Sequence, residues 1–502
     1  MIGRRSLLIV ISTIVAAALS FIGLLAMTNY LGKDVYGNIS WFLATVATLN
    51  IVSDLGFQNA HIKRVSEGQD ENDCISTYFV VKLILTSVMV VFVFASIFVW
   101  NWISNSVMSP ESWNLVILFV LYYAMYDFAW VVIYTYNARM ETTKSQLIAL
   151  TDPLIRVPLI IFVSVNHLTT TDLAYAYVFA AFGVLLVSAF MLKRGSFRWK
   201  KPTMFRSYIK FALPLSLIAI AGAITLNLDK MLIGYFDGTG SVAYYSSSQT
   251  FIRTFSVLGT AVAALAFPSF SMLHTKGDIA AIRKVTHAAE RYISMIGTPI
   301  VALFIVFPTE ICVTFFGSQF APAGDVLRFL AVWLWLTLLN QVYNSQILGV
   351  NRPDISAKRT MGTFILNVIL LFVFVPDEIF GVRMLGMSYT GAAIATAITA
   401  VALFISVRII LKKLTGTGSN PAVLKHLFAG VVAGVAIAAL GTAYHFSGVI
   451  AFIVFGAVTV GVFFAVLAVL KEFTKTDIAY FTDLINPIKM LSYMGGEMKN
   501  KR

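Results

Sequence analysis

Fourteen separate runs of apolar residues, each long enough to cross a bilayer, constrain this sequence more than any other feature. The hydrocarbon core of a membrane is about 30 Å thick, so a spanning helix needs about 20 apolar residues. With 58% hydrophobic and only 12% charged residues, a soluble multidomain protein is excluded. We therefore predict an all-α polytopic membrane protein of about fourteen transmembrane helices, over residues 6–28, 39–60, 77–100, 113–136, 147–165, 172–192, 208–235, 242–271, 291–308, 323–349, 360–376, 386–410, 424–444 and 449–470.

The Lys and Arg residues predict which side of the membrane each loop occupies, because basic loops are retained in the cytoplasm during insertion. With the N-terminus inside, thirty of the 37 Lys and Arg fall in cytoplasmic segments, and only Lys33 and Arg383 fall outside. An even number of spans returns the chain to the side where it began. We expect a multi-pass protein of the cell membrane with both termini cytoplasmic. The net charge of +13 then reflects orientation and attraction to anionic lipids, not nucleic acid.

Weak internal similarity indicates a repeat. The turn at residues 30–36 resembles 235–244, and 137–141 resembles 350–354. Because each unit contains six spans, the two units point the same way, related by a pseudo-two-fold axis along the membrane normal. The expected domains are an N-terminal lobe (1–192), a basic cytoplasmic linker (193–207), a C-terminal lobe (208–410), two further helices (424–470) and a cytoplasmic tail (471–502).

Polar residues inside the spans are the candidates for a functional site, since an ionisable group at bilayer depth costs about 2.5–3.5 kcal/mol without a partner or a wet cavity. Span 242–271 carries one polar stripe at helical spacing, formed by Ser246, Gln249, Thr250, Arg253, Ser256 and Thr260. Arg253 lies near mid-depth, where a guanidinium could hold a phosphate bidentately. A carboxylate on a neighbouring helix could instead hold it. We favour the cavity.

Span 113–136 places Tyr123, Asp127, Trp130 and Tyr134 on one face. Aromatic planes beside a carboxylate suit sugar rings or a cation. A polar clasp between helices with packed aromatic rings gives the same pattern, and the sequence leaves both interpretations open.

Four further cations lie in the spans. Lys230 and Arg328 fall toward the outer ends of their spans, where each either contributes to a substrate site or snorkels to the interface. Arg156 follows Asp152 by four residues, a spacing that favours a structural pair. Lys82 lies close to the predicted inner surface, and we expect it to snorkel.

Asp54 and His61 form a smaller polar stripe toward the inner side, which suits the coupling of transport to a proton or sodium ion, or else a structural motif at a helix end. Cys74, expected in an inner loop, and Cys312, expected in an outer one, cannot pair. Motifs for a phosphate loop, a metal site or a hydrolase are missing, so we expect no enzyme activity, no cofactor and no metal.

Several segments together resemble the polysaccharide biosynthesis and export proteins, the Wzx-type flippases. They are residues 30–37 (YLGKDVYG), 54–60 (DLGFQNA), 63–66 (KRVS), 211–215 (FALPL), 227–234 (NLDKMLIG) and the tyrosine pair 244–245. The similarity runs in order through nearly the full chain. It implies the multidrug, oligosaccharidyl-lipid and polysaccharide exporter superfamily, with two six-helix lobes around a central cavity.

The resemblance also implies a function: translocation of a polyprenyl-phosphate-linked or pyrophosphate-linked oligosaccharide from the cytoplasmic to the outer leaflet by alternating access. Membrane lipids and the glycosyltransferases or polymerase of the same pathway are the implied partners. Related flippases have a cationic cavity, where Arg253 is the best match and Lys230 and Arg156 are looser ones. Beyond Arg4 and Arg5 the first helix lacks the basic residues of the lipid II branch, which argues against a peptidoglycan precursor.

Two other functions remain open. A cation-coupled drug or small-molecule antiporter of the same superfamily would need carboxylates such as Asp54 and Asp127 to dominate the cavity. A non-transporting scaffold of a glycan assembly complex is the third, although the short loops disfavour it.

Overall fold

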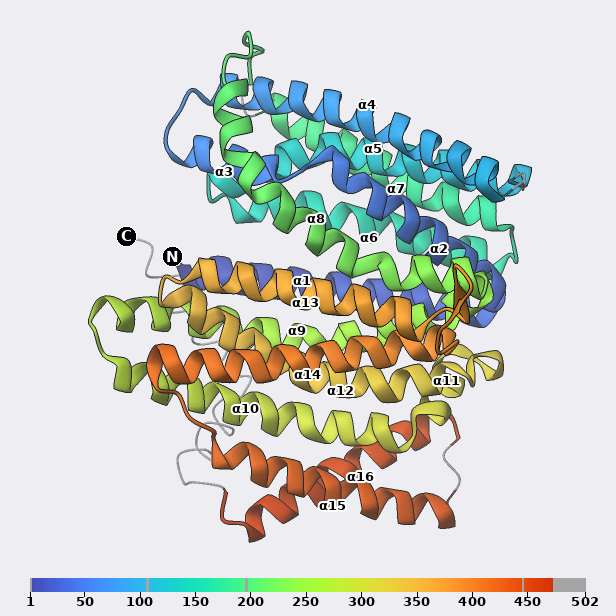
Figure 1. Cartoon of the computed structure of the whole chain (residues 1–502), viewed down its shortest axis with the longest axis vertical. Coiled ribbons are helices and arrows are strands. Elements are labelled where there is room, and N and C mark those ends of the chain that lie inside the picture. Colours follow the sequence, from blue (N-terminus) through green and yellow to red (C-terminus); the bar gives the residue numbers. More distant parts are fainter. Residues whose placement is uncertain (1, 105–107, 195–196, 445–446, 473–502) are drawn as a thin grey trace.

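The computed structural model describes residues 2–104, 108–194, 197–444 and 447–472 (Figure 1). The side chains of Arg4 and Arg5, and the predicted tail apart from its first two residues, lie outside the described part. Long helices that run close to parallel make up nearly all of the chain, as the apolar runs predict.

The first half of the chain holds seven helices, joined by short turns. A π-helical turn (Met27–Leu31) follows the first helix, and a 3-10 turn (Asn50–Ser53) follows the second. The helices are α1 (Ile2–Ala26), α2 (Gly32–Leu49), α3 (Phe57–Ser66), α4 (Glu71–Ser104), α5 (Pro110–Ala138), α6 (Thr142–Val165) and α7 (Thr170–Arg194).

In the described residues of the second half, 197–444 and 447–472, there are nine α-helices and a two-stranded antiparallel ribbon. The helices are α8 (Phe205–Phe236), α9 (Thr239–Thr275), α10 (Ile279–Val306), α11 (Pro308–Phe316), α12 (Ala323–Gly349), α13 (Pro353–Phe374), α14 (Ser388–Thr415), α15 (Pro421–Ala443) and α16 (Gly448–Val469). A 3-10 turn (Ser318–Phe320) precedes α12, and the ribbon, β1 (Glu378–Ile379) with β2 (Val382–Arg383), joins α13 to α14. Apolar periodicity predicted neither the short α11 nor the ribbon.

Within the described residues, twelve helices are long and apolar enough to cross a membrane, or thirteen if the bent α8 is one span. The bend of 57° falls after Pro214, which removes a backbone hydrogen bond from the helix. The first of the twelve covers 42 residues, from Ser12 to Ser53, and includes the junction between α1 and α2. The prediction of an all-α polytopic membrane protein is confirmed.

The predicted continuous helix over 39–60 is wrong. The chain leaves the helical conformation at Leu55 (φ 47°) and Gly56 (φ 84°), between the 3-10 turn and α3. Residues in the left-handed region cannot continue a right-handed helix. Helix α3 begins at Phe57, and Asp54 Oδ1 accepts a hydrogen bond from the Gln58 amide in its first turn at 3.1 Å. The sequence stays hydrophobic through this break, so the apolar run did not predict it.

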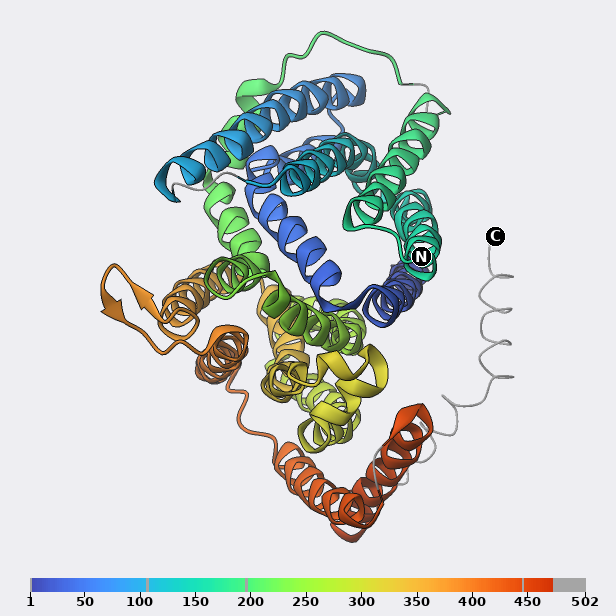
Figure 2. The ribbon, with the colours of Figure 1, turned by 90° about the vertical axis from the view of Figure 1, so that its right-hand side faces the viewer.

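The helices form two packed groups that meet along α1, α2, α8 and α9. Figure 1 shows α3 to α7 toward one end of the long axis, with α9 to α14 beyond α1 and with α15 and α16 at the far end. Figure 2, turned by 90°, shows the same order with the helices nearly end-on. Across the boundary, α2 packs on α8 and α9, α1 on α9, and α8 on α13.

The two turns that the sequence comparison matched pack against each other. Gly32 (φ 82°) begins α2 and Gly238 (φ 85°) precedes α9, so the same left-handed backbone serves both turns. A Cβ on Gly37 would lie 2.0 Å from the Thr239 carbonyl oxygen, which requires glycine there. Lys33 Nζ donates to the Tyr244 hydroxyl at 3.1 Å across the same contact.

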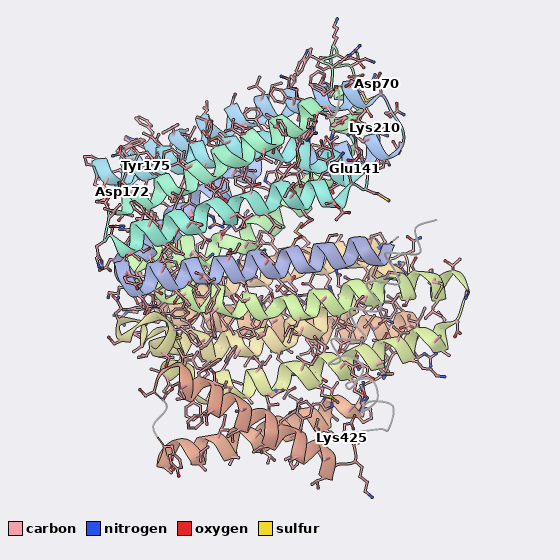
Figure 3. The ribbon with its side chains drawn as sticks, turned by 180° about the vertical axis from the view of Figure 1, so that it is seen from behind. Asp70, Glu141, Asp172, Tyr175, Lys210 and Lys425 are labelled. Atoms are coloured by element: carbon pink, nitrogen blue, oxygen red, sulfur yellow. The ribbon has the colours of Figure 1, made fainter. Side chains whose placement is uncertain are left out.

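Charged residues lie at both ends of the helices. Figure 3 shows Asp70, Glu141, Lys210 and Lys425 at one end of the helices and Asp172 at the opposite end. We call the first of these ends the basic end, because the described loops at this end carry most of the Lys and Arg that the sequence places in cytoplasmic loops.

Candidate functional site

A cavity of about 210 Å³, here called the central cavity, lies at the boundary between the two groups of helices. Side chains from α1, α2, α5, α6, α7, α8 and α9 line it. Its polar lining consists of Ser20, Tyr36, Ser40, Tyr123, Arg156, Tyr177, Asn227, Lys230, Ser246 and Thr250. Among the described residues, the lining therefore contains two cations, one from each half of the chain, and no carboxylate.

Arg156 enters the central cavity from α6 while it pairs with Asp152. Its Nη2 lies 2.8 Å from Asp152 Oδ2, and its Nε donates to the same oxygen at 3.0 Å. The guanidinium also lies over the Tyr177 ring, 5.0 Å from the ring centroid. Asp152 contacts the guanidinium of Arg156 with one oxygen and from one side. Other N–H donors of this guanidinium are therefore available to a ligand in the central cavity. Arg156 thus forms the predicted ion pair with Asp152 and also lines the central cavity.

Lys230 enters the same cavity from α8 and has no ion pair. Its backbone amide donates to Asp229 Oδ1 at 2.7 Å, but its ammonium has no hydrogen-bond or ion-pair partner among the described residues. The charges of Arg253 and Asp229 both act on this ammonium, and the first repels it while the second attracts it. A half-buried ammonium that forms no ion pair among the described residues and lies beside a cavity is suited to an anionic ligand.

A second cavity of about 180 Å³, here called the C-terminal cavity, lies on the other side of α8 and α9. Its polar lining consists of Thr225, Asp229, Gln249, Arg253, Trp333, Thr337, Thr363, Asn367, Thr396 and Thr399. Gln249 Nε2 donates to Asp229 Oδ2 at 2.9 Å. Arg253 has no ion pair within the described part of the chain. It faces a hollow as expected, but not the one that Lys230 and Arg156 share.

The single polar stripe predicted on span 242–271 is divided by the structure. Ser246 and Thr250 line the central cavity, whereas Gln249 and Arg253 line the C-terminal cavity. Since residues three apart on a helix differ by about 60° around the axis, one broad stripe can serve two cavities. The α8–α9 pair is therefore the wall between them.

Three of the predicted site residues differ in how they relate to these cavities. Tyr123 lines the central cavity, and its hydroxyl lies 3.4 Å from the Leu43 carbonyl oxygen. Trp130 stacks on Tyr134 at 5.0 Å and is not among the lining residues of either cavity. The Arg328 side chain is 50% exposed, 3.9 Å from Asp325, and also lines neither.

Lys82 does not snorkel, so that expectation is wrong. Its side chain is 2% exposed, and its Nζ lies 3.1 Å from Asp54 Oδ2 and 3.1 Å from Asp127 Oδ1. Ser53 and Thr86 donate to the Asp127 carboxylate at 2.8 and 3.1 Å. Two carboxylates offset the cost of burying the ammonium, so the side chain turns inward. Asp127 thus joins helices α4 and α5 to the break after α2.

His61 and Asp54 have partners in neighbouring clusters. The His61 ring nitrogens lie 2.9 Å from the Tyr208 hydroxyl and 2.8 Å from Thr135 Oγ1. Its ring stacks on Tyr78 at 4.6 Å, and the Tyr78 hydroxyl donates to Asp54 Oδ2 at 3.2 Å. Within the described residues, no three His, Cys, Asp or Glu side chains gather as metal ligands would.

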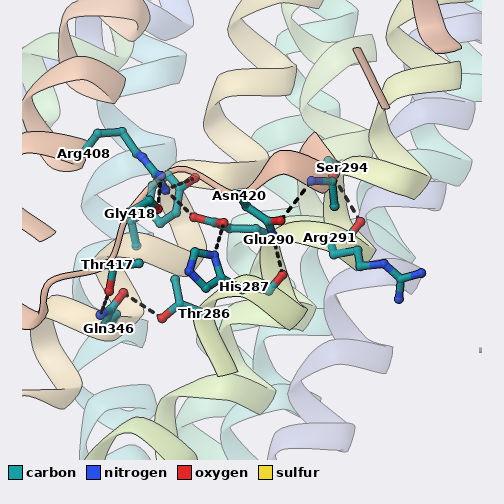
Figure 4. A network of polar contacts seen from close by, with 12 residues as sticks. Thr286, His287, Glu290, Arg291, Ser294, Gln346, Arg408, Thr417, Gly418 and Asn420 are labelled. Atoms are coloured by element: carbon teal, nitrogen blue, oxygen red, sulfur yellow. Dashed lines mark hydrogen bonds and ion pairs between the residues drawn. The ribbon is translucent and has the colours of Figure 1, made fainter. Parts of the chain in front are cut away.

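A second polar cluster joins helices at the basic end of the C-terminal half (Figure 4). Arg408 on α14 pairs with the buried Glu290 on α10 and donates to the Tyr343 hydroxyl at 3.2 Å. His287 Nδ1 lies 3.2 Å from Glu290 Oε2, and Asn420 donates to the His287 carbonyl oxygen at 2.8 Å. This cluster resembles that of Lys82, since its cation also has a carboxylate.

The two cysteines are free and buried. Cys74 lies on α4 and Cys312 on α11, so the expectation that both lie in loops is wrong.

Several lining residues escaped the sequence analysis. Tyr36 and Tyr177 line the central cavity, and Asn367, Thr396 and Thr399 line the C-terminal cavity. All of these except Tyr36 are polar residues within an apolar span, which is a weak signal that many buried helix contacts share. Tyr36 belongs to the 30–37 motif, whose position beside a cavity could have drawn attention to it.

Comparison with known proteins gives a consistent result. The sequence profile of a family described as "Polysaccharide biosynthesis protein" matches residues 9–325, which is more than half of the chain. The probable low-salt glycan biosynthesis flippase Agl15 of Haloferax volcanii is 25% identical over 404 residues, which cover 79% of this chain and 81% of that protein.

The fold is similar to that of solved membrane transporters. The lipid II flippase MurJ in an inward closed conformation matches with a TM-score of 0.73 and 13% identity, covering 95% of this chain and 99% of MurJ. An inward-facing multidrug resistance transporter of the MATE family matches with a TM-score of 0.62 and 16% identity, covering 80% of this chain and 96% of the transporter. The relatives are flippases and transporters rather than enzymes.

Proposed function

We propose that this chain, which belongs to the polysaccharide biosynthesis protein family, is a flippase for a lipid-linked oligosaccharide. The substrate is a polyprenyl phosphate or pyrophosphate that carries a glycan, and the direction is from the cytoplasmic to the outer leaflet. The similarity to a probable glycan flippase supports the class of cargo. Glycosyltransferases or a polymerase of the same pathway are the proposed partners.

The observation that carries this proposal is the charge of the central cavity. Arg156 and Lys230 line it together with tyrosines, hydroxyl groups and an amide, and its lining holds no carboxylate. Phosphate is the anion that such cations bind best, and a charge-assisted hydrogen bond contributes about 1.5–3 kcal/mol. Tyrosine rings and hydroxyl groups suit sugar faces and sugar hydroxyls.

The architecture that we propose has fourteen spans. It counts α1 and α2 separately, because 42 helical residues would extend about 63 Å, twice the hydrocarbon thickness. The bent α8 counts as one span. Two lobes, 1–192 and 208–410, then repeat with the same orientation. The Gly32 and Gly238 turns, which share a backbone conformation and lie side by side, support the repeat.

The proposed mechanism is alternating access with both termini in the cytoplasm. The lobes rock about their boundary at α1, α2, α8 and α9, while the headgroup crosses in the cavity and the polyprenyl tail stays in lipid. The barrier that this removes is the transfer of phosphate and sugar hydroxyls through hydrocarbon, where each unsatisfied polar group costs several kcal/mol.

The cation-coupled antiporter is less well supported. The two carboxylates predicted for it, Asp54 and Asp127, both lie 3.1 Å from Lys82 Nζ. Asp229 lines the C-terminal cavity, where its Oδ2 accepts a hydrogen bond from Gln249. A role for Asp54 and His61 in binding a coupling ion stays a proposal. A scaffold that does not transport is the third alternative.

The test is a flipping assay in proteoliposomes with a fluorescent polyprenyl-pyrophosphate oligosaccharide. The full chain should make the inner-leaflet label accessible from outside, and empty vesicles should not. If the chain instead moves a cationic drug and leaves the lipid-linked glycan in place, the antiporter is correct. If neither moves, the scaffold is favoured.

A further inference from the structure

A groove of about 450 Å³ lies between α13 and α14 near the basic end. Ile355, Lys358, Arg359, Gly362, Thr363, Leu366, Ala402, Ser406 and Ile410 line it. Apolar side chains on the outer faces of the same helices are exposed, among them Ile365, Ile369, Ile405 and Ile409. In a bilayer these faces contact acyl chains, so the groove is open to the membrane from the side.

Arg359 has donor groups in this groove that nothing in the described chain uses. Its Nη2 donates to Asn344 Oδ1 at 3.0 Å, and the same oxygen accepts a hydrogen bond from Ser356 at 2.7 Å. Nε and Nη1 of Arg359 are buried and have no hydrogen-bond partner among the described residues. Buried donors in proteins nearly always have an acceptor, so these two point to a ligand.

The charges around the groove select the class of that ligand. Lys358 lies next to Arg359, and neither forms an ion pair within the described residues. The part of the chain that the structure describes contributes no carboxylate to the groove lining. A planar guanidinium beside a flexible ammonium favours a phosphate, which offers several acceptor oxygens and a full charge.

The groove also leads inward. Thr363 follows Arg359 by one helical turn, and it lines both this groove and the C-terminal cavity that contains Arg253. The Thr363 hydroxyl donates to the Arg359 carbonyl oxygen at 3.0 Å, so both residues lie on one face of α13. A phosphate bound at Arg359 is therefore one turn of helix away from the hollow where Arg253 has no ion pair.

We propose that Lys358 and Arg359 form the site where the phosphate or pyrophosphate of the lipid-linked substrate first binds as it leaves the cytoplasmic leaflet, with Thr363 at the passage toward Arg253. This rests on the proposed function and on the basic end facing the cytoplasm. A site for bulk phospholipid would require the same cations. The continuity with an internal cavity favours the transported lipid, whose headgroup has to move inward.

The test compares binding by the full chain in detergent of two probes, polyprenyl pyrophosphate and phosphatidylglycerol. Arg359→Gln should weaken polyprenyl-pyrophosphate binding about tenfold, equivalent to 1.4 kcal/mol, and Lys358→Gln about threefold. Lys413→Gln is the matched control, because it removes one exposed positive charge from the same end outside the groove and should change neither affinity. Unchanged polyprenyl-pyrophosphate binding in Arg359→Gln overturns the proposal, and an equal loss of phosphatidylglycerol assigns the groove to bulk lipid.

Thr363→Leu tests the passage without removing a charge. It should slow flipping about tenfold in proteoliposomes at a saturating concentration of the lipid-linked glycan, where a weaker affinity alone would not limit the rate. Wild-type flipping by both Thr363→Leu and Arg359→Gln would exclude this entry route while the proposed function stands. If the wild-type chain itself fails to flip the lipid-linked glycan, the proposed function fails first.

Discussion

The cations inside the two halves of the molecule differ in whether they form ion pairs with carboxylates. In the N-terminal half, Lys82 lies 3.1 Å from each of two carboxylates and is almost fully buried. In the C-terminal half, Lys230 and Arg253 line cavities, and among the described residues neither has an ion pair. The comparison separates two uses of a buried positive charge. A cation with carboxylates holds helices together, whereas one without them beside a hollow is available to an anion.

The position of Arg156 shows that the two uses can combine. It pairs with Asp152 at 2.8 Å and still lines the central cavity. The Glu290–Arg408 pair shows that the C-terminal half also contains a paired cation, at a contact between α10 and α14. The difference therefore follows the cavities and not the halves as such.

The largest effect should come from Lys82→Met. It leaves Asp54 and Asp127 without their cation in the interior, and removing one partner of a buried ion pair typically costs about 3–5 kcal/mol. The melting temperature of the purified protein in detergent should fall steeply, or the protein should fail to accumulate. Lys230→Met makes the same replacement at a cation without a carboxylate and should melt within a few degrees of wild type. Equal stability of both variants would contradict the distinction.

Lys230→Met should instead impair transport. Loss of one charge-assisted hydrogen bond to phosphate corresponds to about 1.5–3 kcal/mol, or a 10- to 100-fold lower flipping rate at limiting substrate. The measurement is the initial rate in proteoliposomes at matched protein density. Lys230→Arg keeps the charge and should retain most of the rate. Wild-type transport by Lys230→Met would remove this residue from the site.

Asp152→Asn converts Arg156 from a paired cation to an unpaired one. The freed guanidinium should bind the polyprenyl pyrophosphate more tightly, by about threefold to fivefold, or less than about 1 kcal/mol. Binding titrations of the purified variant measure this directly. A weaker affinity would mean that Asp152 orients Arg156 for the ligand, and that the pair belongs to the site as a unit.

The smallest effect concerns a paired cluster beyond α16. Burial raises the pKa of the Glu472 carboxyl, but hydrogen bonds from Lys425 and Arg291 outweigh it and hold the pKa below its usual value of 4.5. The ionised carboxylate therefore stabilises the folded state at neutral pH, and this contribution is lost as the pH falls through the lowered pKa. Hydrogen exchange near the end of α16 should become faster as the pH falls below the usual carboxyl pKa of 4.5, and the loss of protection should correspond to about 1 kcal/mol or less. Glu472→Gln should show the faster exchange already at pH 7, and a pH response that survives this substitution would assign the effect to another group.

Much of the fold follows from hydrophobicity alone, because a lipid environment leaves helices as the way to satisfy each backbone group. The features that the apolar runs did not predict are short, local departures from helical structure. The break at Leu55 and Gly56 lies within a hydrophobic stretch, and the ribbon at Glu378–Arg383 is too short for a periodic signal.

The site was predicted less completely, for reasons of geometry. Lys82, Asp54 and Asp127 come from three segments, so a sequence cannot show that they meet, and position near a membrane surface suggested snorkelling instead. Arg253 and Lys230 were recognisable as cations inside spans. Their separation into two cavities depends on how the α8–α9 pair is rotated, which side-chain packing determines.

The most direct test of the central claim is the affinity of the full chain for two lipids that differ only in charge. One is a polyprenyl-pyrophosphate oligosaccharide, and the other carries the same glycan through an uncharged ether. If cations without carboxylates bind the phosphate, wild type should prefer the charged lipid by at least about tenfold, and Lys230→Met should lose most of that preference. Equal affinity of the wild-type chain for both lipids would contradict the account.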